Sequence, residues 1–503
     1  AAGHRILAVN RGEREEWLKV SVECDDERAC QIIRREVVEP GSACCEVVRA
    51  AADDAWARLI EPSLEREIRN ELTDKANEGA IRVFGDNLHQ LLMQPPIRGK
   101  VTLGVDPGFR TGCKLAVVDE NGKVLETGVG YFTLPIHEAK KAQAKAQILG
   151  MIRRHGVTAI AIGNGTASRE SEQFIASLLP EAPNAAYVIV SEAGASVYSA
   201  SKLAAKEFPE YDVSLRSAVS IARRMQDPLA ELVKIDPKAI GVGQYQHDLK
   251  QAELENALSG VVESCVSSVG VDVETASASL LTHVAGIGET LANNIVAYRD
   301  ENGITSRAQL KKVPKLGPKA FEQCAGFLRV HGSNPLDATA VHPESYAAAK
   351  ALMERLGYTP QMLKRGGIVG IAAKAEEVGV AKLAQELEIG EMTLRDILSE
   401  LEKPGRDPRD ELPAPVLRTD VLSMEDLKPG MELTGTVRNV IDFGAFVDIG
   451  VHQDGLVHIS RMSDKFIRHP SEAVHVGDVV TVWVVDVDVK KQRIALTMVK
   501  GRA

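Results

Sequence analysis

The chain has 503 residues, a formal net charge of −10 and an apolar fraction of 44%. This length exceeds what one hydrophobic core can hold, so we expect several domains of a folded protein. Aromatic residues make up only 4% of the chain, and no run of 18 uncharged apolar residues occurs, which argues against a carbohydrate-binding protein and against a membrane span. The acidic balance excludes coating of a polyanion by the whole surface, so nucleic acid would need local basic patches.

The chain starts with AAGHRILAVN, which has neither an initiator Met nor the basic and apolar regions of a signal peptide. We therefore expect that an N-terminal part is missing. The seven cysteines are scattered apart from the adjacent Cys44 and Cys45, and they form no C-x-x-C pair. This spacing favours reduced thiols in a cytoplasmic protein over disulfides or a zinc site.

Residues 1–97 are expected to be a helical scaffold with short N-terminal strands. The segments RILAVNRGE (5–13) and WLKVSV (17–22) are strand-like, and a helical segment follows them. Its apolar side chains recur at helical spacing, namely Leu64, Ile68, Leu72 and Ala76. Pro95 and Pro96 end the region.

Residues 98–226 are expected to form a mixed α/β domain. The segments VTLGVD, KLAVVD and VLETGVGYF predict three consecutive antiparallel strands. Helices then alternate with the strands VTAIAIG and AAYVIVS. This is the strand and helix order of a ribonuclease H-like fold.

The middle of the chain is expected to be mainly helical. We expect a helical connector over residues 227–279, and a helical segment with a charged, Pro-rich linker over residues 333–420. Between them, residues 280–332 hold an imperfect internal repeat of about 30 residues. Each half of the repeat has a short glycine turn followed by an amphipathic helix.

The two glycine turns are candidate phosphate-binding sites. In AGIGETLANNI, Gly286 and Gly288 let the backbone approach a ligand, and the N–H groups of the turn can bind a phosphate oxygen. The second turn, VPKLGPKAF, has Lys315 where the first has Gly286, and it contains Gly317 and Lys319. The alternative is a purely structural turn between packed helices. The doubled unit resembles tandem helix-hairpin-helix modules, which implies binding to the phosphate backbone.

Residues 424–503 predict an all-β barrel. About five strands with period-two alternation are separated by short Gly or Asp turns, which suits an OB-fold. Outward rings of Phe443 and Phe446 would offer a platform for base stacking, completed by His458 and Arg493. The alternative is that both rings belong to the core.

The pattern TGTVRNVIDFGAFVDIG…DGLVHISRMS followed by DVDVKKQRIALTM closely resembles the S1 RNA-binding domain. The resemblance implies RNA contacts at Phe443, Phe446, His458, Asp488 and Arg493. Lys465 lies nearby in the sequence and is a candidate phosphate contact.

Asp106 ends the first strand of the α/β domain and raises the question of nuclease activity. A two-metal nuclease needs three or four converging carboxylates. VDPGFRTG…AVVD, AIGNGTASRE and VSEAGASVYSAS together resemble the YqgF and RuvC-like branch of the ribonuclease H-like fold. The resemblance implies acids after the first strand, near the fourth strand and on the last helix.

This acid set is incomplete in the sequence. The fourth-strand site offers Asn164 rather than a carboxylate, Glu192 is a plausible acid, and the last helix places Arg216 or a neighbour where an acid is expected. Asp212 is close in sequence. We therefore name Asp106, Glu192 and Asp212 only as vestigial candidates and expect no metal site. Asp106 is then expected to cap its turn by accepting N–H bonds from PGFRTG.

We expect a multidomain protein, mainly α, with an α/β ribonuclease H-like domain and a C-terminal S1 barrel of the OB-fold type. The whole chain resembles the Tex family of bacterial transcription accessory proteins, also through GVGQYQHDL, VGVDVETAS and LRDILSELEKPGRDPR. The resemblance implies a cytoplasmic protein that binds single-stranded RNA or DNA and acts with the transcription machinery, without cofactor or membrane partner. A metal-dependent nuclease and a pure interaction scaffold remain the alternatives. No P-loop supports nucleotide hydrolysis.

Overall fold

The fold is given by a computed structural model. It describes residues 2–133, 138–412, 415, 417–418, 427–441, 443–451, 453–468, 470–474, 478–489, 491 and 493–502. The chain divides into two compact units, residues 1–88 with 241–260 and residues 89–240 with 261–503. No helix within these described ranges is long and apolar enough to cross a membrane.

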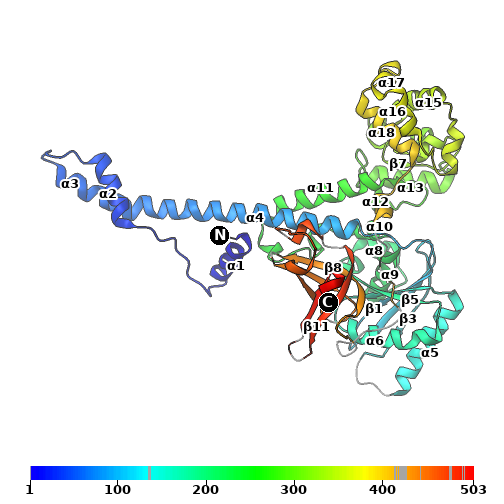
Figure 1. The fold of residues 1–503 in the computed structure, drawn as a ribbon, viewed down its shortest axis with the longest axis horizontal. Coiled ribbons are helices and arrows are strands. Elements are labelled where there is room, and N and C mark those ends of the chain that lie inside the picture. Colours follow the sequence, from blue (N-terminus) through cyan, green and yellow to red (C-terminus); the bar gives the residue numbers. More distant parts are fainter. Residues whose placement is uncertain are drawn as a thin grey trace. The chain divides into compact units, whose positions relative to one another are not determined.

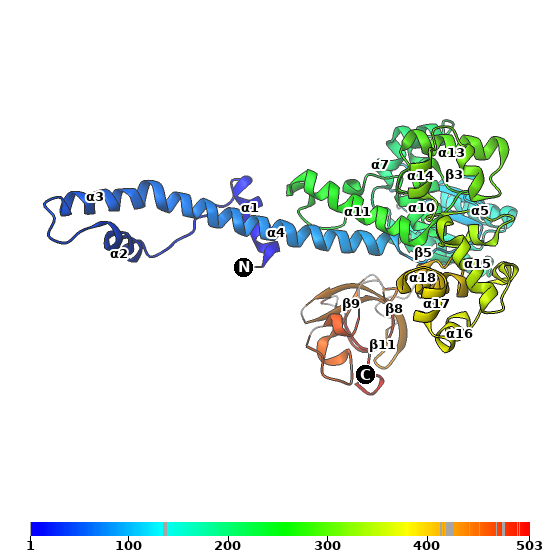
Figure 2. The ribbon, with the colours of Figure 1, turned by 90° about the horizontal axis from the view of Figure 1, so that it is seen from above.

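The first unit is built from helices, drawn in blue and green in Figure 1. They are α1 (Gly3–Arg14), α2 (Asp26–Val37), α3 (Cys45–Ala55), α4 (Glu61–Leu92) and the first half of α11 (Gln251–Val269). The last residues of α4 and the second half of α11 belong to the second unit. The helix expected around Leu64 is thus confirmed as part of α4, which is 32 residues long and is seen along its length in Figure 2.

The prediction of two N-terminal strands over residues 5–13 and 17–22 is wrong. The first segment lies inside α1, and the second is in neither a helix nor a strand. The physical reason is that residues three apart contact α4 from one face of a helix. Asn10 donates to Thr73 at 3.0 Å, and Glu13 pairs with Arg69. A strand would turn such residues to opposite faces, so tertiary contacts with α4 decide over local β-propensity.

The α/β domain has a five-stranded sheet in the order β3-β2-β1-β4-β5. Its strands are β1 (Thr102–Asp106), β2 (Cys113–Val118), β3 (Val124–Gly130), β4 (Ala159–Gly163) and β5 (Ala186–Val190). Its helices are α5 (Glu138–His155), α6 (Ser168–Leu178), α7 (Ala195–Ala200), α8 (Lys202–Glu207) and α9 (Val213–Gln226). The first three strands are antiparallel neighbours, and β4 and β5 run parallel to β1. The expected strand and helix order is confirmed.

Helices cover both faces of this sheet. On one face, the buried side chains of Leu103 and Val105 join a core with Ile148 of α5 and Ile175 of α6. On the other face, α9 lies so close to β1 that a Cβ atom at Gly104 would collide with the α9 backbone. This close approach places the residues of α9 beside the end of β1, where Asp106 lies.

The segment between the α/β domain and the barrel is mainly helical, as expected. Its helices are α10 (Pro228–Leu232), α12 (Ala278–Leu281), α13 (Glu289–Asn302), α14 (Pro318–Cys324), α15 (Tyr346–Arg355), α16 (Ile371–Val378), α17 (Val380–Glu386) and α18 (Glu391–Glu402). A parallel pair of two-residue strands, β6 (Val271–Asp272) and β7 (Leu328–Arg329), was not expected. Strands of this length are too short to show a hydrophobic period.

The Pro-rich linker is packed over its first part. Arg409 is buried, and its guanidinium pairs with Asp227 at 2.8 Å and with Asp407 at 2.8 Å. Arg98 also pairs with Asp407 at 2.5 Å. Burial of paired charges orders a charged segment that composition alone predicts to be a free linker. Residues 413–414, 416 and 419–426 lie outside the described residues.

The C-terminal barrel is closed, with the strand order β10-β12-β11-β8-β9. Its strands are β8 (Glu432–Ile441), β9 (Gly444–Asp448), β10 (Gly455–His458), β11 (Val479–Asp488) and β12 (Arg493–Thr497). Its core consists of alternate apolar residues, among them Val447, Val457, Val482 and Leu496. The expected OB-type barrel is confirmed.

Candidate nucleic-acid interface

The outer face of the barrel carries a row of side chains from three adjacent strands. Strand register places Phe446 of β9 opposite Leu456 of β10, and Leu456 opposite Ala495 of β12. His458 and Arg493 are each two residues from this row, so the pleat turns them to the same face. The residues between them point inward and are buried: Ala445, Val447, Val457, Ile494 and Leu496.

Phe443 lies in the turn between β8 and β9, and its side chain is 51% exposed. The carbonyl oxygen of Phe443 accepts a hydrogen bond from the Ile459 N–H at 2.9 Å. Gly444 pairs with His458, so the Phe443 turn and the end of β10 lie at the same end of the barrel. The exposed His458 ring is fixed by a hydrogen bond of 2.9 Å between Nδ1 and the Ser460 hydroxyl.

Asp488 and Lys465 complete the expected barrel set. Asp488 is paired with Arg493 across the β11–β12 turn. Its carboxylate accepts the Lys491 N–H at 3.0 Å and lies 3.5 Å from the Lys491 ammonium, so it holds the turn. Lys465 is exposed on the segment that follows β10, and its N–H donates to the Ser463 hydroxyl at 3.1 Å.

The two hairpins share one backbone conformation although their sequences differ. Gly286 has φ of +80° and Lys315 has φ of +68°. Gly288 and Gly317 then cap the following helices with φ of −86° and −77°. The lysine in place of glycine therefore leaves the turn intact. Added Cβ atoms at Gly288 or Gly317 would meet open space, so the hairpin tips are accessible.

The first hairpin borders a hollow of about 380 Å³. Residues 284–288 line it together with Glu263, Thr282 and His283. His283 is partly buried, and this burial lowers the pKa of its ring, although the Val233 carbonyl acts in the opposite direction. The hollow is therefore lined by the hairpin backbone, one carboxylate and one imidazole that favours the neutral form.

A third hairpin between α17 and α18 was missed in the sequence. Glu388 has φ of +53°, and Gly390 caps α18 with φ of −69°. These residues repeat the geometry of Gly286 and Gly288 with a different charge. The signal was present as an apolar residue and glycine just before a helix, in LEIGE, but a glutamate stands where the first hairpin has glycine.

In the α/β domain, Asp106 and Glu192 interact and Asp212 has another role. Burial raises the pKa of Asp106, against the hydrogen bond from Ser217 and the charge of Lys114. Burial also raises the pKa of Glu192, and the Asp106 charge adds to this effect. Asp212 is exposed and caps α9 by accepting the Leu215 N–H at 2.8 Å.

The last-helix position that meets Asp106 is Ser217, one residue beyond Arg216. Arg216 instead donates to the carbonyl oxygens of Phe208 at 3.0 Å and Ser199 at 3.4 Å. Arg216 therefore holds the segment before α9, and the acid expected from this helix is replaced by a hydroxyl.

The turn after Asp106 is not capped in the expected way. Within the described residues, no hydrogen bond joins the Asp106 carboxylate to the N–H groups of residues 107–112. The buried Lys114 ammonium holds this turn by donating to the carbonyl oxygens of Thr111 at 3.0 Å and Gly112 at 2.9 Å. A lysine with three donors satisfies the outward carbonyls, whereas a carboxylate can only accept.

Glu192 forms two hydrogen bonds with the loop after β4. Its N–H donates to the Asn164 side-chain oxygen at 3.0 Å, and its carboxylate accepts the Gly165 N–H. Among the residues that the structure describes, no group of three or more His, Cys, Asp or Glu side chains is arranged to hold a metal ion.

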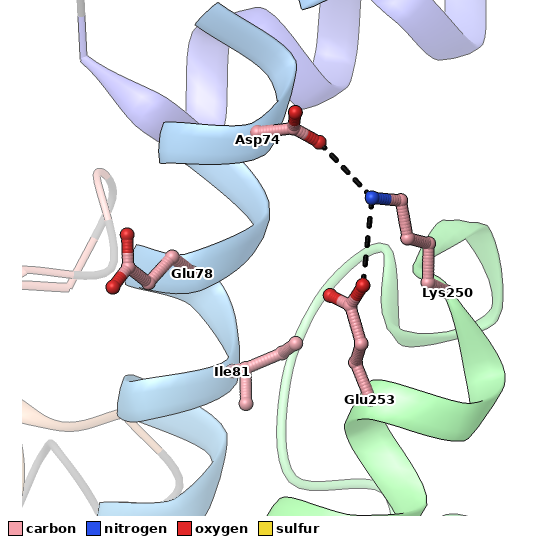
Figure 3. A pocket seen from close by; sticks show the side chains of 5 residues that line it. All are labelled: Asp74, Glu78, Ile81, Lys250 and Glu253. Atoms are coloured by element: carbon pink, nitrogen blue, oxygen red, sulfur yellow. Dashed lines mark hydrogen bonds and ion pairs between the residues drawn. The ribbon is translucent and has the colours of Figure 1, made fainter. Parts of the chain in front are cut away.

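A second hollow lies in the first unit, between α4 and α11. Figure 3 shows Lys250 pointing toward Asp74 and Glu253, and its ammonium lies 3.1 Å and 3.4 Å from their carboxylate oxygens. Glu78 and Ile81 also line this hollow. A lining with three carboxylates and one ammonium does not suit a polyanion. This hollow is not part of the candidate interface.

Models of five known families match successive parts of the chain. Their descriptions are Tex central region-like for residues 1–84, Tex protein YqgF-like domain for 100–226, Helix-hairpin-helix motif for 266–329, HHH domain for 334–409 and S1 RNA binding domain for 426–498. The HHH domain match contains the third hairpin at Glu388 and Gly390.

Similar proteins come from several bacteria. The chain is 54% identical to the Bacillus subtilis (strain 168) protein YdcI, over 99% of this chain and 69% of that protein. It is 50% identical to the Transcriptional accessory protein Tex of Neisseria gonorrhoeae, over 98% of this chain and 65% of that protein. The chain thus spans about two thirds of the length of these relatives. A solved RuvC structure from Thermus thermophilus aligns with 27% of this chain and 95% of its own, at 18% identity and a TM-score of 0.21.

The domain matches follow one another in the order of the structural elements described above, from the helices of the first unit to the C-terminal barrel. The identity to the Bacillus subtilis relative extends over nearly the whole chain. This chain belongs to the Tex family of transcriptional accessory proteins.

Proposed function

We propose that this chain is a cytoplasmic, non-catalytic nucleic-acid-binding protein that acts in or around transcription with little sequence preference. The single observation that carries the proposal is the outward row on the barrel, where Phe446, His458 and Arg493 share one face. The exposed Phe443 lies at the end of the same barrel. An aromatic surface beside basic groups suits unpaired bases and their backbone.

In this proposal, Phe443 and Phe446 stack on the bases of single-stranded RNA or DNA. Each stacked base contributes about 1–3 kcal/mol, and every base offers a π-face, so stacking tolerates any sequence. Arg493 and Lys465 bind phosphate oxygens, and His458 contacts the backbone or a base edge.

The hairpins add phosphate contacts without reading bases. The turn at Gly286 and Gly288 offers backbone N–H groups ahead of α13, and the turn at Gly317 adds the positive charges of Lys315 and Lys319. Two weak sites on one chain raise the overall affinity through their effective concentration.

The experiment is a titration of labelled single-stranded RNA, single-stranded DNA and duplex DNA, followed by fluorescence anisotropy. The variant with Phe443→Ala and Phe446→Ala is expected to lose most single-strand binding while it remains folded. Trp17→Ala removes another exposed aromatic side chain, 81% exposed in the first unit, and serves as the matched control. Unchanged affinity of the double variant would refute the stacking role.

A metal-dependent nuclease is the second candidate, because Asp106 lies close enough for its charge to raise the pKa of Glu192. Against it, the helix position beside Asp106 is Ser217 and the Glu192 carboxylate is bound by the Gly165 N–H. One or two carboxylates rarely hold two magnesium ions. The same titration in EDTA, Mg²⁺ and Mn²⁺ should leave the substrate intact on a gel. Metal-dependent shortening that disappears in Asp106→Asn would establish the nuclease instead.

A further inference from the structure

Phe466 is an exposed aromatic side chain that the expected interface does not include. Its side chain is 90% exposed, more than that of Phe443 at 51%. A phenyl ring in water costs free energy in proportion to its apolar surface. A single exposed apolar side chain is common on protein surfaces, so the meaning of this one depends on its neighbours.

The segment around Phe466 is anchored on both sides. Met462 is buried in the barrel core, and Ile467 packs against the same core. The Arg461 carbonyl oxygen accepts the Met498 N–H at 2.9 Å, which fixes the start of the segment to the end of β12. Phe466 therefore lies between two fixed points and still faces solvent.

The segment 461–468 that carries Phe466 is basic in composition. Residues 461–468 contain three basic side chains, Arg461, Lys465 and Arg468, against one acid, Asp464. Lys465 and Arg468 are exposed and flank Phe466 in the sequence. The whole chain carries a charge of −10, so this segment is a local positive patch around an aromatic ring.

The patch begins where the Phe443 turn is attached. Ile459, which donates its N–H to the Phe443 carbonyl oxygen, starts the short 3-10 helix Ile459–Arg461. That helix leads directly into the segment with Lys465 and Phe466. The basic aromatic segment therefore starts from the barrel end that bears Phe443 and His458.

We propose that Phe466 is a third base-stacking residue, and that Lys465 and Arg468 bind the phosphates beside that base. This inference rests on the proposed function, because it extends the path of the same single strand beyond Phe443. A protein partner would need an apolar pocket for the ring and acidic groups around it. A nucleic-acid strand supplies a flat π-surface and flanking negative charges in every nucleotide. These fit an aromatic side chain with basic side chains next to it in the sequence.

The test compares two oligomers of about 12 nucleotides, a length within the range bound by OB-folds. One is oligouridine and the other has the same backbone without bases. Phe466→Ala is expected to weaken oligouridine binding about tenfold and to leave the abasic oligomer unaffected, because only the base contact is lost. Phe466→Trp should restore the affinity for oligouridine. Lys465→Ala should weaken both oligomers.

Val369→Ala is the matched control, since Val369 is 89% exposed in the helical segment between the second and third hairpins. Its affinity should equal that of the unaltered chain. Equal oligouridine affinity of Phe466→Ala and the unaltered chain would overturn the inference and leave a protein partner as the occupant. Equal weakening of both oligomers by Phe466→Ala would also overturn it. If the unaltered chain bound neither oligomer, the proposed function itself would fail.

Discussion

The Glu192 carboxylate lies directly against Gly165 and accepts its backbone N–H. A Cβ atom at Gly165 would collide with this carboxylate, so the contact depends on the glycine. Asn164 accepts the Glu192 N–H in return, at 3.0 Å. Glu192 thereby joins the loop after β4 to the loop after β5. The Glu192 carboxylate is therefore a structural link between these two loops.

The first prediction concerns this link. Gly165→Ala should push the Glu192 side chain away, and Glu192→Ala should remove the same hydrogen bond, so each should destabilise the domain by about 1–3 kcal/mol. Because both changes remove one contact, the double variant should be no less stable than the worse single variant. Thermal unfolding of the three variants measures this. Additive losses would show that Glu192 and Gly165 act independently.

The second prediction concerns pH. Burial raises the pKa of Asp106 above the ordinary value of 3.8, so the folded state holds this proton more strongly than the unfolded state. The stability of the folded state therefore falls as the pH rises from about 3.8 through the folded pKa, and the cost is fully present above the folded pKa. Asp106→Asn should remove this cost and still accept the Ser217 hydrogen bond.

Thermal unfolding of Asp106→Asn should give a higher midpoint than the unaltered chain at pH 7. The difference should shrink as the pH falls and disappear below about 3.8, where the carboxyl is protonated in both states. Asp212→Asn is the control, since Asp212 is exposed and an asparagine can still cap α9. A lower midpoint of Asp106→Asn at pH 7 would contradict burial as the dominant influence.

The outer face of the barrel could be predicted because inward and outward side chains alternate along each strand with period two. Once Ala445 and Val447 are assigned to the core, Phe446 between them must lie on the outer face of the barrel. Phe466 could not be predicted in this way, because it lies between Met462 and Ile467 in a segment without a regular period. Its exposure is decided by which neighbours reach the core.

The hairpins and the carboxylates show two other limits of the sequence. A left-handed residue is expected to be glycine, so Glu388 concealed the third hairpin. On α9, neighbouring residues differ by about 100° around the helix axis. Moving from Arg216 to Ser217 therefore changes which side chain meets Asp106, and the sequence cannot fix the helix phase to one residue. Only the packing of α9 on β1 sets this phase.

The third prediction separates charge from backbone in the second hairpin. Lys315 has a left-handed φ of +68°, which is unfavourable by about 1 kcal/mol for a residue with a Cβ atom. Lys315→Gly should preserve the turn and leave the stability equal or slightly higher. It should lower the slope of log affinity against log salt by about one, because one phosphate contact is lost.

Lys315→Gln keeps the backbone strain but loses the charge, so it should give the same reduced slope without the gain in stability. Lys350→Ala removes an exposed charge on α15 and should leave the slope unchanged. Duplex DNA titrated at several salt concentrations provides the measurement. An unchanged slope in both Lys315 variants would show that Lys315 makes no phosphate contact.

The last prediction concerns Asp488, which stands opposite Arg493 and accepts the Lys491 N–H. The resemblance to S1 domains implies a nucleic-acid contact there, whereas its hydrogen bond indicates that it holds the turn. Asp488→Asn keeps an acceptor for Lys491 and removes a negative charge beside Arg493. Its stability should change by less than about 0.5 kcal/mol, because the exposed ion pair with Lys491 contributes little. Single-stranded RNA should bind about two- to fivefold more tightly, since one repulsive charge is gone.

Asp488→Ala distinguishes the turn from the charge, because it should gain a similar affinity but lose about 1 kcal/mol of stability with the hydrogen bond. Asp396→Asn, an exposed acid on α18, controls for the change in net charge. The measurement is RNA anisotropy at low salt together with thermal unfolding. Weaker RNA binding by Asp488→Asn would mean that the carboxylate itself accepts a hydrogen bond from the nucleic acid, and Asp488 would then be a direct contact rather than a turn residue.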